Sequence, residues 1–380
     1  MKVTCARRDL FEGVQTVGRI VSGRSTLPIL THILIQTGED HLRLLSTDFE
    51  VGMELTVPAA VSTGGAVTVP ARVLQDLLSS LPDSSVELSV DENNVMHIGC
   101  VRSHYALRGL PAEDFPALPG VQGGRAVELE QRVLKRVINE TLFAVSVDET
   151  RALLTGALTI LANGVIKMVT TDTHRLAVSV MPVEGLRIED SDGDEGVIIP
   201  ARALRELARV LSDEPGNMVQ VELTRNQAAF RMEGLVLVSR LIDGQFPNFE
   251  RVIPKEHQKR LVLNTEEFLA ALRRACSILP RGGSNRVVFQ TETEGFLDIR
   301  SEAGEVGSAH EQVEVVREGD PIEIAFNGNY LIDMLSITEA ESVVLELGGA
   351  VSPAVIHPLP TDDTPEGRLY QYVVMPMAIQ

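Results

Sequence analysis

The chain repeats one pattern of strands and helices three times along its 380 residues. Each copy opens with a short alternating segment that leads into an amphipathic helix, expected at 10–21, 133–145 and 268–279. In the third copy, Asn264 or Thr265 is a suitable N-cap, with acidic residues in the first turn that follows. The spacing of the copies is that of a small domain, so we expect the chain to contain three of them.

Each copy then has a strand that ends in a short polar segment, at Asp48, Asp172 and Glu302. A second helix follows, at 71–81 and 201–211 in the first two copies and within 327–341 in the third. Pro-Ala-Arg opens the first two of these helices, where the missing N–H of proline costs little. The repetition predicts an α+β fold of three similar domains, each with two helices and antiparallel sheets.

The expected domains cover residues 1–123, 124–256 and 257–380. Their boundaries are placed near 120–124 and 254–259 because both segments are rich in turn formers or charge. Repeated units of strands and helices pack side by side. Since the repeat is domain-sized, an arc or a ring is expected rather than a tight solenoid.

The composition is that of a folded protein, with 44% hydrophobic and 23% charged residues. The N-terminus lacks the apolar core of a signal peptide, and the longest apolar-rich run, 152–166, is too short and too polar to span a bilayer. Cys5, Cys100 and Cys276 form neither a disulfide framework nor a CxxC metal pair. We therefore expect a cytoplasmic protein that does not associate with membranes.

The net charge of −19 argues against a protein that grips nucleic acid through an overall positive surface. The charge is unevenly distributed, however, because the expected helices carry a slight excess of Lys and Arg while the strands and loops are strongly acidic. The plain explanation is that Arg is itself a helix-forming residue. The functional alternative is a helical face that tolerates phosphates, with an outer face that repels them.

Motifs for catalysis or cofactor binding are absent from the sequence. It has no GxxxxGK[ST] phosphate loop, no GxGxxG after a strand and no His/Cys spacing that suits zinc. The acidic run at 189–195 lacks the Gly and the final Glu of a calcium loop, so we expect a solvated loop. We predict no catalytic residue, metal or cofactor. The alternative is a metal-dependent hydrolase using Asp172 and His174, although no nucleophile or second carboxylate accompanies them.

The segment TTDTHRLA at 170–177 distinguishes the second copy from the other two. Its Thr and Asp side chains are typical of a turn between strands, because short oxygen side chains bond the local backbone. His174, Arg175 and Leu176 follow, and the first and third copies lack this triplet. The segment is either an ordinary turn or the wall of a binding site in the middle copy.

Four segments carry a resemblance to a known family: GRSTLPIL at 23–30, TDTHRLA at 171–177, LIDGQFP at 241–247 and YVVMPM at 372–377. Together with the three copies, they make the whole chain similar to the bacterial DNA polymerase III beta subunit family, the sliding clamps. The resemblance implies a head-to-tail homodimer that closes as a ring, with helices lining the hole. It implies a non-catalytic processivity factor that encircles double-stranded DNA and tethers DNA polymerase subunits, the clamp loader and repair factors through short linear peptides.

The resemblance also implies three groups of site residues. Arg24 and Arg72 would face the DNA, and the repeated Pro-Ala-Arg extends this role to Arg202. A pocket for partner peptides, between the second and third domains, would be formed by Arg151, Leu154, Thr171, Thr173, His174, Arg175, Leu176, Pro247, Val252, Tyr330, Pro353, Val373, Met375, Pro376 and Met377. The dimer interface would join Arg102, Tyr105 and Leu107 to Ile278, Leu279, Glu302 and Glu305.

Plainer alternatives exist, because the apolar pocket residues could be ordinary core and 102–107 an ordinary edge strand. His174 and Arg175 are expected to hydrogen-bond the polar flank of a bound peptide. The chain also departs from the family in three places. Thr173 stands where the family often has Gly, the loop at 187–196 is long and acidic, and the tail at 378–380 could partly shield the pocket.

Overall fold

The computed structural model describes residues 1–21, 26–118, 125–183, 196–280, 282–304, 306–362 and 364–379. The chain forms two compact units, Met1–Arg132 with Arg205–Leu241 and Val133–Leu204 with Ile242–Gln380. Within the described residues, no helix is both long enough and apolar enough to cross a membrane.

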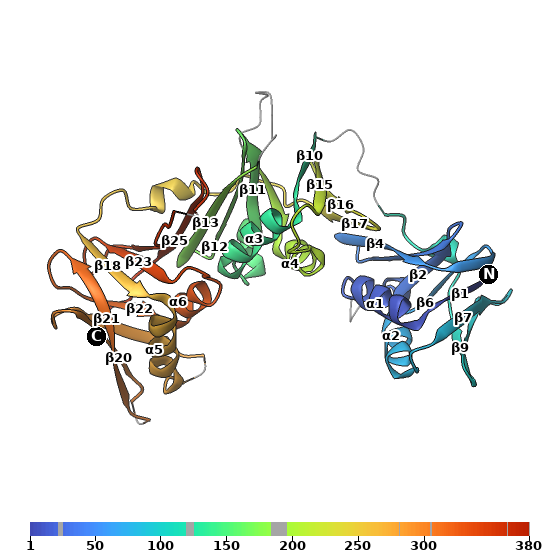
Figure 1. The fold of residues 1–380 in the computed structure, drawn as a ribbon, viewed down its shortest axis with the longest axis horizontal. Helices are drawn as coiled ribbons and strands as arrows, with labels where there is room; N and C mark the ends of the chain where they lie inside the picture. The colour runs from blue at the N-terminus through green and yellow to red at the C-terminus, as the bar shows by residue number, and fades with distance from the viewer. Residues whose placement is uncertain are drawn as a thin grey trace. The chain divides into compact units, whose positions relative to one another are not determined.

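The first unit contains two antiparallel sheets (Figure 1). The five-stranded sheet consists, in spatial order, of β5 (Ala60–Thr63), β1 (Lys2–Ala6), β7 (Ser85–Val90), β8 (Val95–Cys100) and β9 (Ser103–Arg108). The eight-stranded sheet consists of β10 (Arg125–Glu130), β15 (Met218–Leu223), β16 (Gln227–Met232), β17 (Leu235–Arg240), β4 (Val51–Pro58), β3 (His41–Thr47), β2 (His32–Thr37) and β6 (Ala66–Pro70). The pairing of β17 with β4 joins strands of the second and first copies in one sheet.

Two helices of the first copy, α1 (Arg7–Gly18) and α2 (Ala71–Ser80), lie side by side in this unit (Figure 1). Helix α1 approaches the sheet closely at Gly13, where an added Cβ would lie 2.7 Å from a methyl group of Val57. The helix begins earlier than the predicted 10–21 because the strand β1 passes into it directly, with the Arg7 N–H donating to the Ser84 carbonyl (3.0 Å). The apolar periodicity marked only the buried face, which starts at Leu10.

The second unit is built on one twelve-stranded antiparallel sheet. In spatial order its strands are β14 (Val197–Pro200), β11 (Gly156–Ala162), β12 (Val165–Thr171), β13 (Arg175–Pro182), β25 (Leu369–Val374), β24 (Ala354–Pro358), β23 (Ser342–Leu347), β18 (Lys259–Asn264), β21 (Ser308–Glu318), β20 (Phe296–Glu302), β19 (Arg286–Gln290) and β22 (Glu323–Asn327). The pairing of β13 with β25 joins the second copy to the last strand of the third.

The helices of the third copy, α5 (Thr265–Ser277) and α6 (Gly328–Leu335), pack on this sheet and on each other. Asn264 is the N-cap of α5, since its side chain accepts from the Glu267 N–H (3.1 Å), which decides between the two predicted caps. The core beneath the helices is aromatic: Phe268, Phe289 and Phe326 are buried, and their rings contact in tilted and edge-on pairs.

The second copy contributes α3 (Gln131–Thr141) and α4 (Ala201–Val210). Short 3₁₀ helices complete the described elements: η1 (Pro28–Thr31), η2 (Ala112–Asp114), η3 (Leu142–Ala144), η4 (Glu149–Leu154) and η5 (Phe249–Val252). The predicted α+β class with antiparallel sheets is confirmed. The domain boundaries stay a prediction, and both 120–124 and most of the acidic loop at 187–196 lie outside the described residues.

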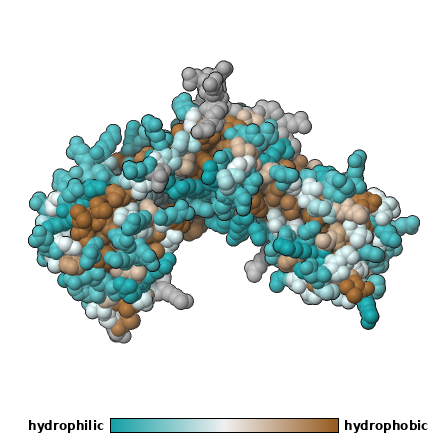
Figure 2. Space-filling view, viewed as in Figure 1, coloured by the Kyte–Doolittle hydropathy of each residue, from teal (hydrophilic) through white to brown (hydrophobic). Residues whose placement is uncertain are grey.

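The face of the molecule shown in Figure 2 is largely hydrophilic, and its hydrophobic residues form separate patches. Among the large apolar side chains with high exposure are Val147 and Val351, at 95% and 89%. Scattered exposed apolar residues are normal on a folded protein. Exposed apolar residues alone therefore do not identify a binding surface in this protein, and a pocket is the more specific indication.

Candidate functional site

A tight turn between β12 and β13 forms the centre of the candidate site. Asp172 accepts hydrogen bonds through Oδ1 from the backbone N–H groups of His174 (2.9 Å) and Arg175 (3.0 Å). The Thr171 hydroxyl donates to the Arg175 carbonyl (2.6 Å) and accepts from the Thr173 N–H (3.1 Å). Within this frame Thr173 has a left-handed backbone, with φ of 79°. The predicted polar turn is confirmed, and its own side chains fix its shape.

The first copy contains the same turn. Asp48 Oδ1 accepts from the N–H groups of Glu50 (3.0 Å) and Val51 (2.8 Å), and the Thr47 hydroxyl again bridges the turn by donating to the Val51 carbonyl (3.0 Å). Phe49 takes the place of Thr173, with φ of 74°. The backbone of the turn is therefore a property of the repeat, and the side chains that follow it distinguish the two sites.

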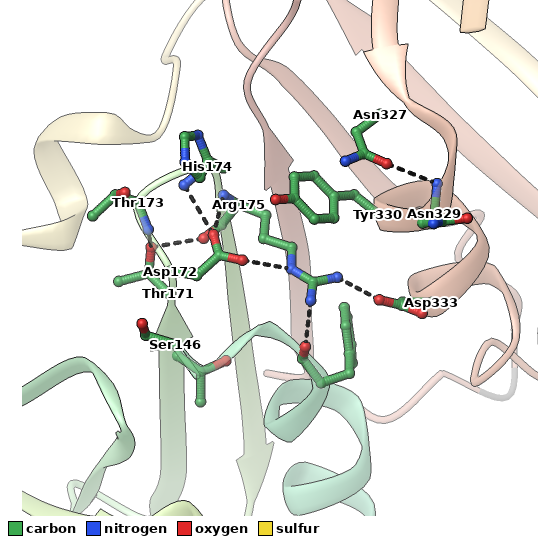
Figure 3. Close-up of polar contacts among 12 residues, drawn as sticks. Ser146, Thr171, Asp172, Thr173, His174, Arg175, Asn327, Asn329, Tyr330 and Asp333 are labelled. Carbon is green, nitrogen blue, oxygen red and sulfur yellow. Dashed lines mark hydrogen bonds and ion pairs between the residues drawn. The ribbon is translucent and has the colours of Figure 1, made fainter. Parts of the chain in front are cut away.

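Arg175 connects the turn to the third copy (Figure 3). Its Nε donates to Asp172 Oδ2 (3.0 Å), Nη1 to Asp333 Oδ2 (2.6 Å) and Nη2 to the Phe143 carbonyl (2.7 Å). The guanidinium also lies 4.4 Å from the ring centroid of Tyr330, within cation–π range. Its side chain is only 10% exposed. Arg175 therefore holds β13 against α6.

The guanidinium of Arg175 remains charged in this setting. Burial by itself would lower the pKa of Arg175, but Tyr372, Asp333 and Asp172 around it outweigh burial, and the net effect is a raised pKa. Three of the five N–H donors of this guanidinium already serve partners within the chain, so the expectation that Arg175 hydrogen-bonds the polar flank of a peptide stays a prediction. Arg175 also forms part of the wall of the site.

A pocket of about 190 Å³ opens beside the turn. Its size suits one or two apolar side chains, and its walls come from the turn, the end of η4, the segment leading into η5 and the end of β25. It is lined by Leu154, Thr171, Thr173, His174, Arg175, Leu176, Pro247, Asn248, Phe249, Val252, Val373 and Met375. The sequence predicted all of these except Asn248 and Phe249, which directly follow the LIDGQFP segment at 241–247.

Five predicted pocket residues are not part of this lining: Arg151, Tyr330, Pro353, Pro376 and Met377. Tyr330 packs on the guanidinium of Arg175, and Arg151 donates to the Thr173 hydroxyl (3.0 Å) at the rim. The Met377 N–H donates to the Ala325 carbonyl (2.7 Å), which pairs the end of the chain with β22.

The C-terminal tail after Met377 also lies against the β19–β22 part of the sheet. The Ala378 carbonyl accepts from Arg286 Nη1 on β19 (3.2 Å), and no residue of the described tail lines the pocket. The expected shielding of the pocket by residues 378–380 is therefore not observed for Ala378 and Ile379. Gln380 lies outside the described residues.

His174 occupies the tip of the turn next to the end of β25. Its carbonyl accepts from the Met375 N–H (2.9 Å), and its ring lies 6.5 Å from that of Tyr330 in a stacked orientation. These contacts bring Met375 to the pocket and leave the imidazole exposed at the mouth. His174 can therefore still meet the polar part of a ligand, as predicted.

The residues predicted to face DNA are exposed where the structure describes them. Arg72 lies on α2 with its side chain 94% exposed, 4.0 Å from Asp76. Arg202 is exposed in the first turn of α4. Arg24 lies outside the described residues.

The predicted interface residues belong to two separate surfaces. Tyr105 is exposed and Leu107 half-buried on β9, an edge strand, and Arg102 is exposed in the turn before it. Ile278 and Leu279 are half-buried just after α5, and Glu302 is exposed at the end of β20. Glu305 lies outside the described residues.

The hydrolase alternative gains no support. Both carboxylate oxygens of Asp172 accept hydrogen bonds from the turn and from Arg175, so the carboxylate is a structural acceptor. In the described parts of the chain, no group of three or more His, Cys, Asp or Glu residues is placed to hold a metal ion.

Comparisons with known proteins agree along the whole chain. Three family models match in succession: DNA polymerase III beta subunit, N-terminal domain, at residues 1–119; central domain, at 128–248; and C-terminal domain, at 250–378. The beta sliding clamp of Halalkalibacterium halodurans is 33% identical, with 94% of this chain and 96% of the relative covered. That of Staphylococcus epidermidis is 32% identical, with 95% and 97% covered.

Solved structures of the same kind share the fold. The DNA polymerase sliding clamp from Bacillus subtilis has a TM-score of 0.91 and 29% identity, covering 100% of both chains. A sliding clamp from Pseudomonas aeruginosa bound to griselimycin has a TM-score of 0.90 and 32% identity, again over 100% of both chains. Nothing in these comparisons supports a hydrolase. The chain belongs to the DNA polymerase III beta subunit family, the bacterial sliding clamps.

Proposed function

We propose that this chain is a DNA sliding clamp whose two copies close head to tail around duplex DNA and tether DNA polymerase, the clamp loader and repair factors without catalysing a reaction. The full-length match to the family carries this proposal. A ring holds DNA by enclosing it, so an overall positive surface is unnecessary and a net charge of −19 is compatible with the role. Tethering raises the effective concentration of a weakly bound polymerase at the primer end. We place the protein in the cytoplasm.

Two open strand edges support the head-to-tail arrangement. In the described residues, β9 pairs with β8 alone, and residues 308–314 of β21 pair with β20 alone. The corresponding edges of the other copies are paired, β17 with β4 and β25 with β13. We infer that β9 of one subunit adds to β21 of the other in the same antiparallel manner, since an unpaired edge is a template for another strand.

The repeat also specifies the register of this pairing. In the first unit Gly52 of β4 lies opposite Val238 of β17. Alignment of the copies places Ala309 in the position of Gly52, two strand residues beyond equivalent turns, and Ala106 in the position of Val238. We therefore expect Ala106 to lie opposite Ala309 of the partner subunit.

The DNA-facing residues are proposed from their type and position. Arg72 and Arg202 each lie two residues after a proline, in the first turn of a helix, and both are exposed. Arg24 completes the proposed set. Exposed arginines of this kind make transient, sequence-independent contacts with phosphates, which suits a protein that slides.

The pocket is proposed to bind short peptide segments of partner proteins. Leu154, Leu176, Val373 and Met375 give it an apolar wall that suits Leu or Phe anchors, and methionine adapts its shape to the guest. Hydroxyl and imidazole groups at the mouth can meet the polar part of the peptide. Arg151, Tyr330, Pro353, Pro376 and Met377 stay proposed as residues at the margin.

A Val252→Glu variant should weaken binding of an apolar-anchored peptide by about tenfold or more, because it places a carboxylate on an apolar wall. Val252 is already 39% exposed, so the variant should fold normally. Val147→Glu is the matched control, since Val147 is 95% exposed and does not line the pocket. Fluorescence anisotropy of a labelled peptide measures the affinity. Equal affinity for both variants would place the peptide elsewhere.

Retention on circular DNA tests the function directly. Protein loaded onto closed circular DNA by a clamp loader should remain bound through gel filtration, and cutting the circle with a restriction enzyme should release it within the same run. The control is a nicked circle, which loses its supercoiling and keeps its closed path. Release from intact and linear DNA at equal rates would refute the encircling mode.

A further inference from the structure

Each of the helices α1 to α5 carries an arginine that is paired with an acidic side chain of the same chain. On α1, Arg8 Nε lies 3.0 Å from Glu12 Oε1, and on α2, Arg72 Nε lies 4.0 Å from Asp76 Oδ2. The other three helices repeat the arrangement in the pairs Arg132–Glu130, Arg136–Glu140, Arg209–Glu206 and Arg274–Glu311. The cations of the helices are therefore accompanied by a nearby countercharge.

The acids of these pairs are of two kinds, buried and exposed. The side chains of Glu140 and Glu206 are only 8% and 10% exposed, and Glu140 also accepts from the Ser179 hydroxyl (2.6 Å), so both belong to the fold. Glu12 and Asp76 are 59% and 75% exposed, on the neighbouring helices α1 and α2 (Figure 1). Exposed ion pairs contribute little to stability. The effect of these two acids is therefore expected on what their arginines meet.

A carboxylate beside an arginine weakens the attraction of that arginine for a phosphate. Asp76 lies 4.0 Å from the guanidinium of Arg72, which is well inside the Debye length of about 8 Å at physiological salt, so its charge is felt almost unscreened. A phosphate that approaches Arg72 meets a partly neutralised cation and is itself repelled by the acid. Glu12 has the same relation to Arg8. Both pairs therefore leave a contact that a phosphate makes and breaks easily.

We propose that Glu12 and Asp76 limit the grip of α1 and α2 on DNA phosphates, so that the protein is held by enclosing the duplex and moves along it with little resistance. This inference rests on the proposed encircling function. The two acids act through Arg8 and Arg72 and are not themselves DNA-binding residues. The net charge of −19 repels DNA from every side, whereas these pairs set the attraction at the helices themselves.

The double variant Glu12→Gln with Asp76→Asn provides the first test, because it removes both charges and keeps the size of the side chains. Its binding to a short labelled linear duplex, followed by fluorescence anisotropy, should be tighter than that of wild type by roughly two- to fivefold for each acid. The plot of log affinity against log salt between about 50 and 200 mM should steepen by about one unit for each acid.

Glu39→Gln with Glu92→Gln is the matched control. These two acids are exposed in the loops that connect β2 to β3 and β7 to β8, so the control changes the net charge by the same amount away from the helices. It should keep the affinity and the salt slope close to those of wild type. An equal gain in the control would assign the effect to net charge and overturn the proposal.

A double-mutant cycle at one pair shows whether the acid acts through its arginine. Asp76→Asn should tighten DNA binding in the wild-type background and should have almost no effect when Arg72→Gln is also present. Thermal melting of the single variants should match wild type, since both side chains are exposed. A gain from Asp76→Asn that persists beside Arg72→Gln would contradict an action through Arg72.

Movement along DNA gives a readout that folding does not change. Tracking of the labelled, loaded protein on stretched duplex DNA should show a diffusion coefficient at least about twofold lower for Glu12→Gln with Asp76→Asn than for wild type. Equal affinity, salt slope and diffusion in both proteins would overturn the role of the two acids and leave the encircling function intact. Loss of wild type from intact circles as fast as from linear DNA would overturn the encircling function itself.

Discussion

A chain that carries Ala106→Cys and Ala309→Cys should form a covalent dimer on mild oxidation, and this dimer should not leave closed circular DNA even in denaturant. Directly opposed residues of antiparallel strands have Cα atoms about 4.5–5.5 Å apart, within the range that a disulfide spans. Each head-to-tail dimer has two such interfaces, so a disulfide would form at each of them and the ring could not open. Non-reducing gel electrophoresis before and after linearisation of the DNA measures the outcome.

Matched controls make the register itself testable. Ala106→Cys combined with Glu314→Cys moves the second thiol five positions along β21, roughly 17 Å at the rise of an antiparallel strand, and should give no covalent dimer. Each single variant should also remain monomeric on the gel, since Cys5 and Cys100 are buried and Cys276 lies in the last turn of α5, outside the paired strands β9 and β21. Cross-linking of the Glu314→Cys pair with equal yield would contradict the inferred pairing.

Local sequence patterns predicted the elements whose stabilising contacts are also local. The Thr-Asp turn at 171–175 is fixed by hydrogen bonds that span two to four residues, and the same holds for its copy at Asp48. Asn264 caps α5 through a residue three positions along. The helix ends were less predictable, because α1 begins where the Arg7 N–H meets Ser84, a partner far along the chain.

The sequence predicted most of the residues that line the site. It did not predict which of them face the ligand and which are held within the fold. Nothing near Arg175 in sequence indicates that Asp333, 158 positions away, takes up one arm of its guanidinium. Two arginines with similar local surroundings therefore have opposite roles, Arg175 inside the fold and Arg151 at the rim. The direction of the tail likewise depends on Ala325 and Arg286, which only the tertiary structure brings to the C-terminus.

Arg175→Met should destabilise the second unit by about 3 kcal/mol or more and abolish peptide binding. The variant removes the cation between Asp172 and Asp333 and leaves the Asp172 carboxylate, which is 15% exposed, without its charged partner. It also removes the donor to the Phe143 carbonyl, so β13 loses its Arg175 contacts with both η3 and α6. For a unit of this size the loss corresponds to roughly 6–12 °C in the melting temperature.

The comparison with Arg151→Met distinguishes a structural arginine from a ligand-facing one. Arg151 is half-exposed, so its replacement should change the unfolding free energy by less than about 0.5 kcal/mol, and its effect should fall on the peptide affinity. Thermal melting of the two variants, followed beside wild type by calorimetry, gives the stabilities, and peptide titration gives the affinities. A melting temperature of Arg175→Met equal to that of wild type, together with weaker peptide binding, would contradict the structural role of Arg175. In that case the guanidinium would act on the ligand, and the contacts to Asp333 and Phe143 would contribute little to the fold.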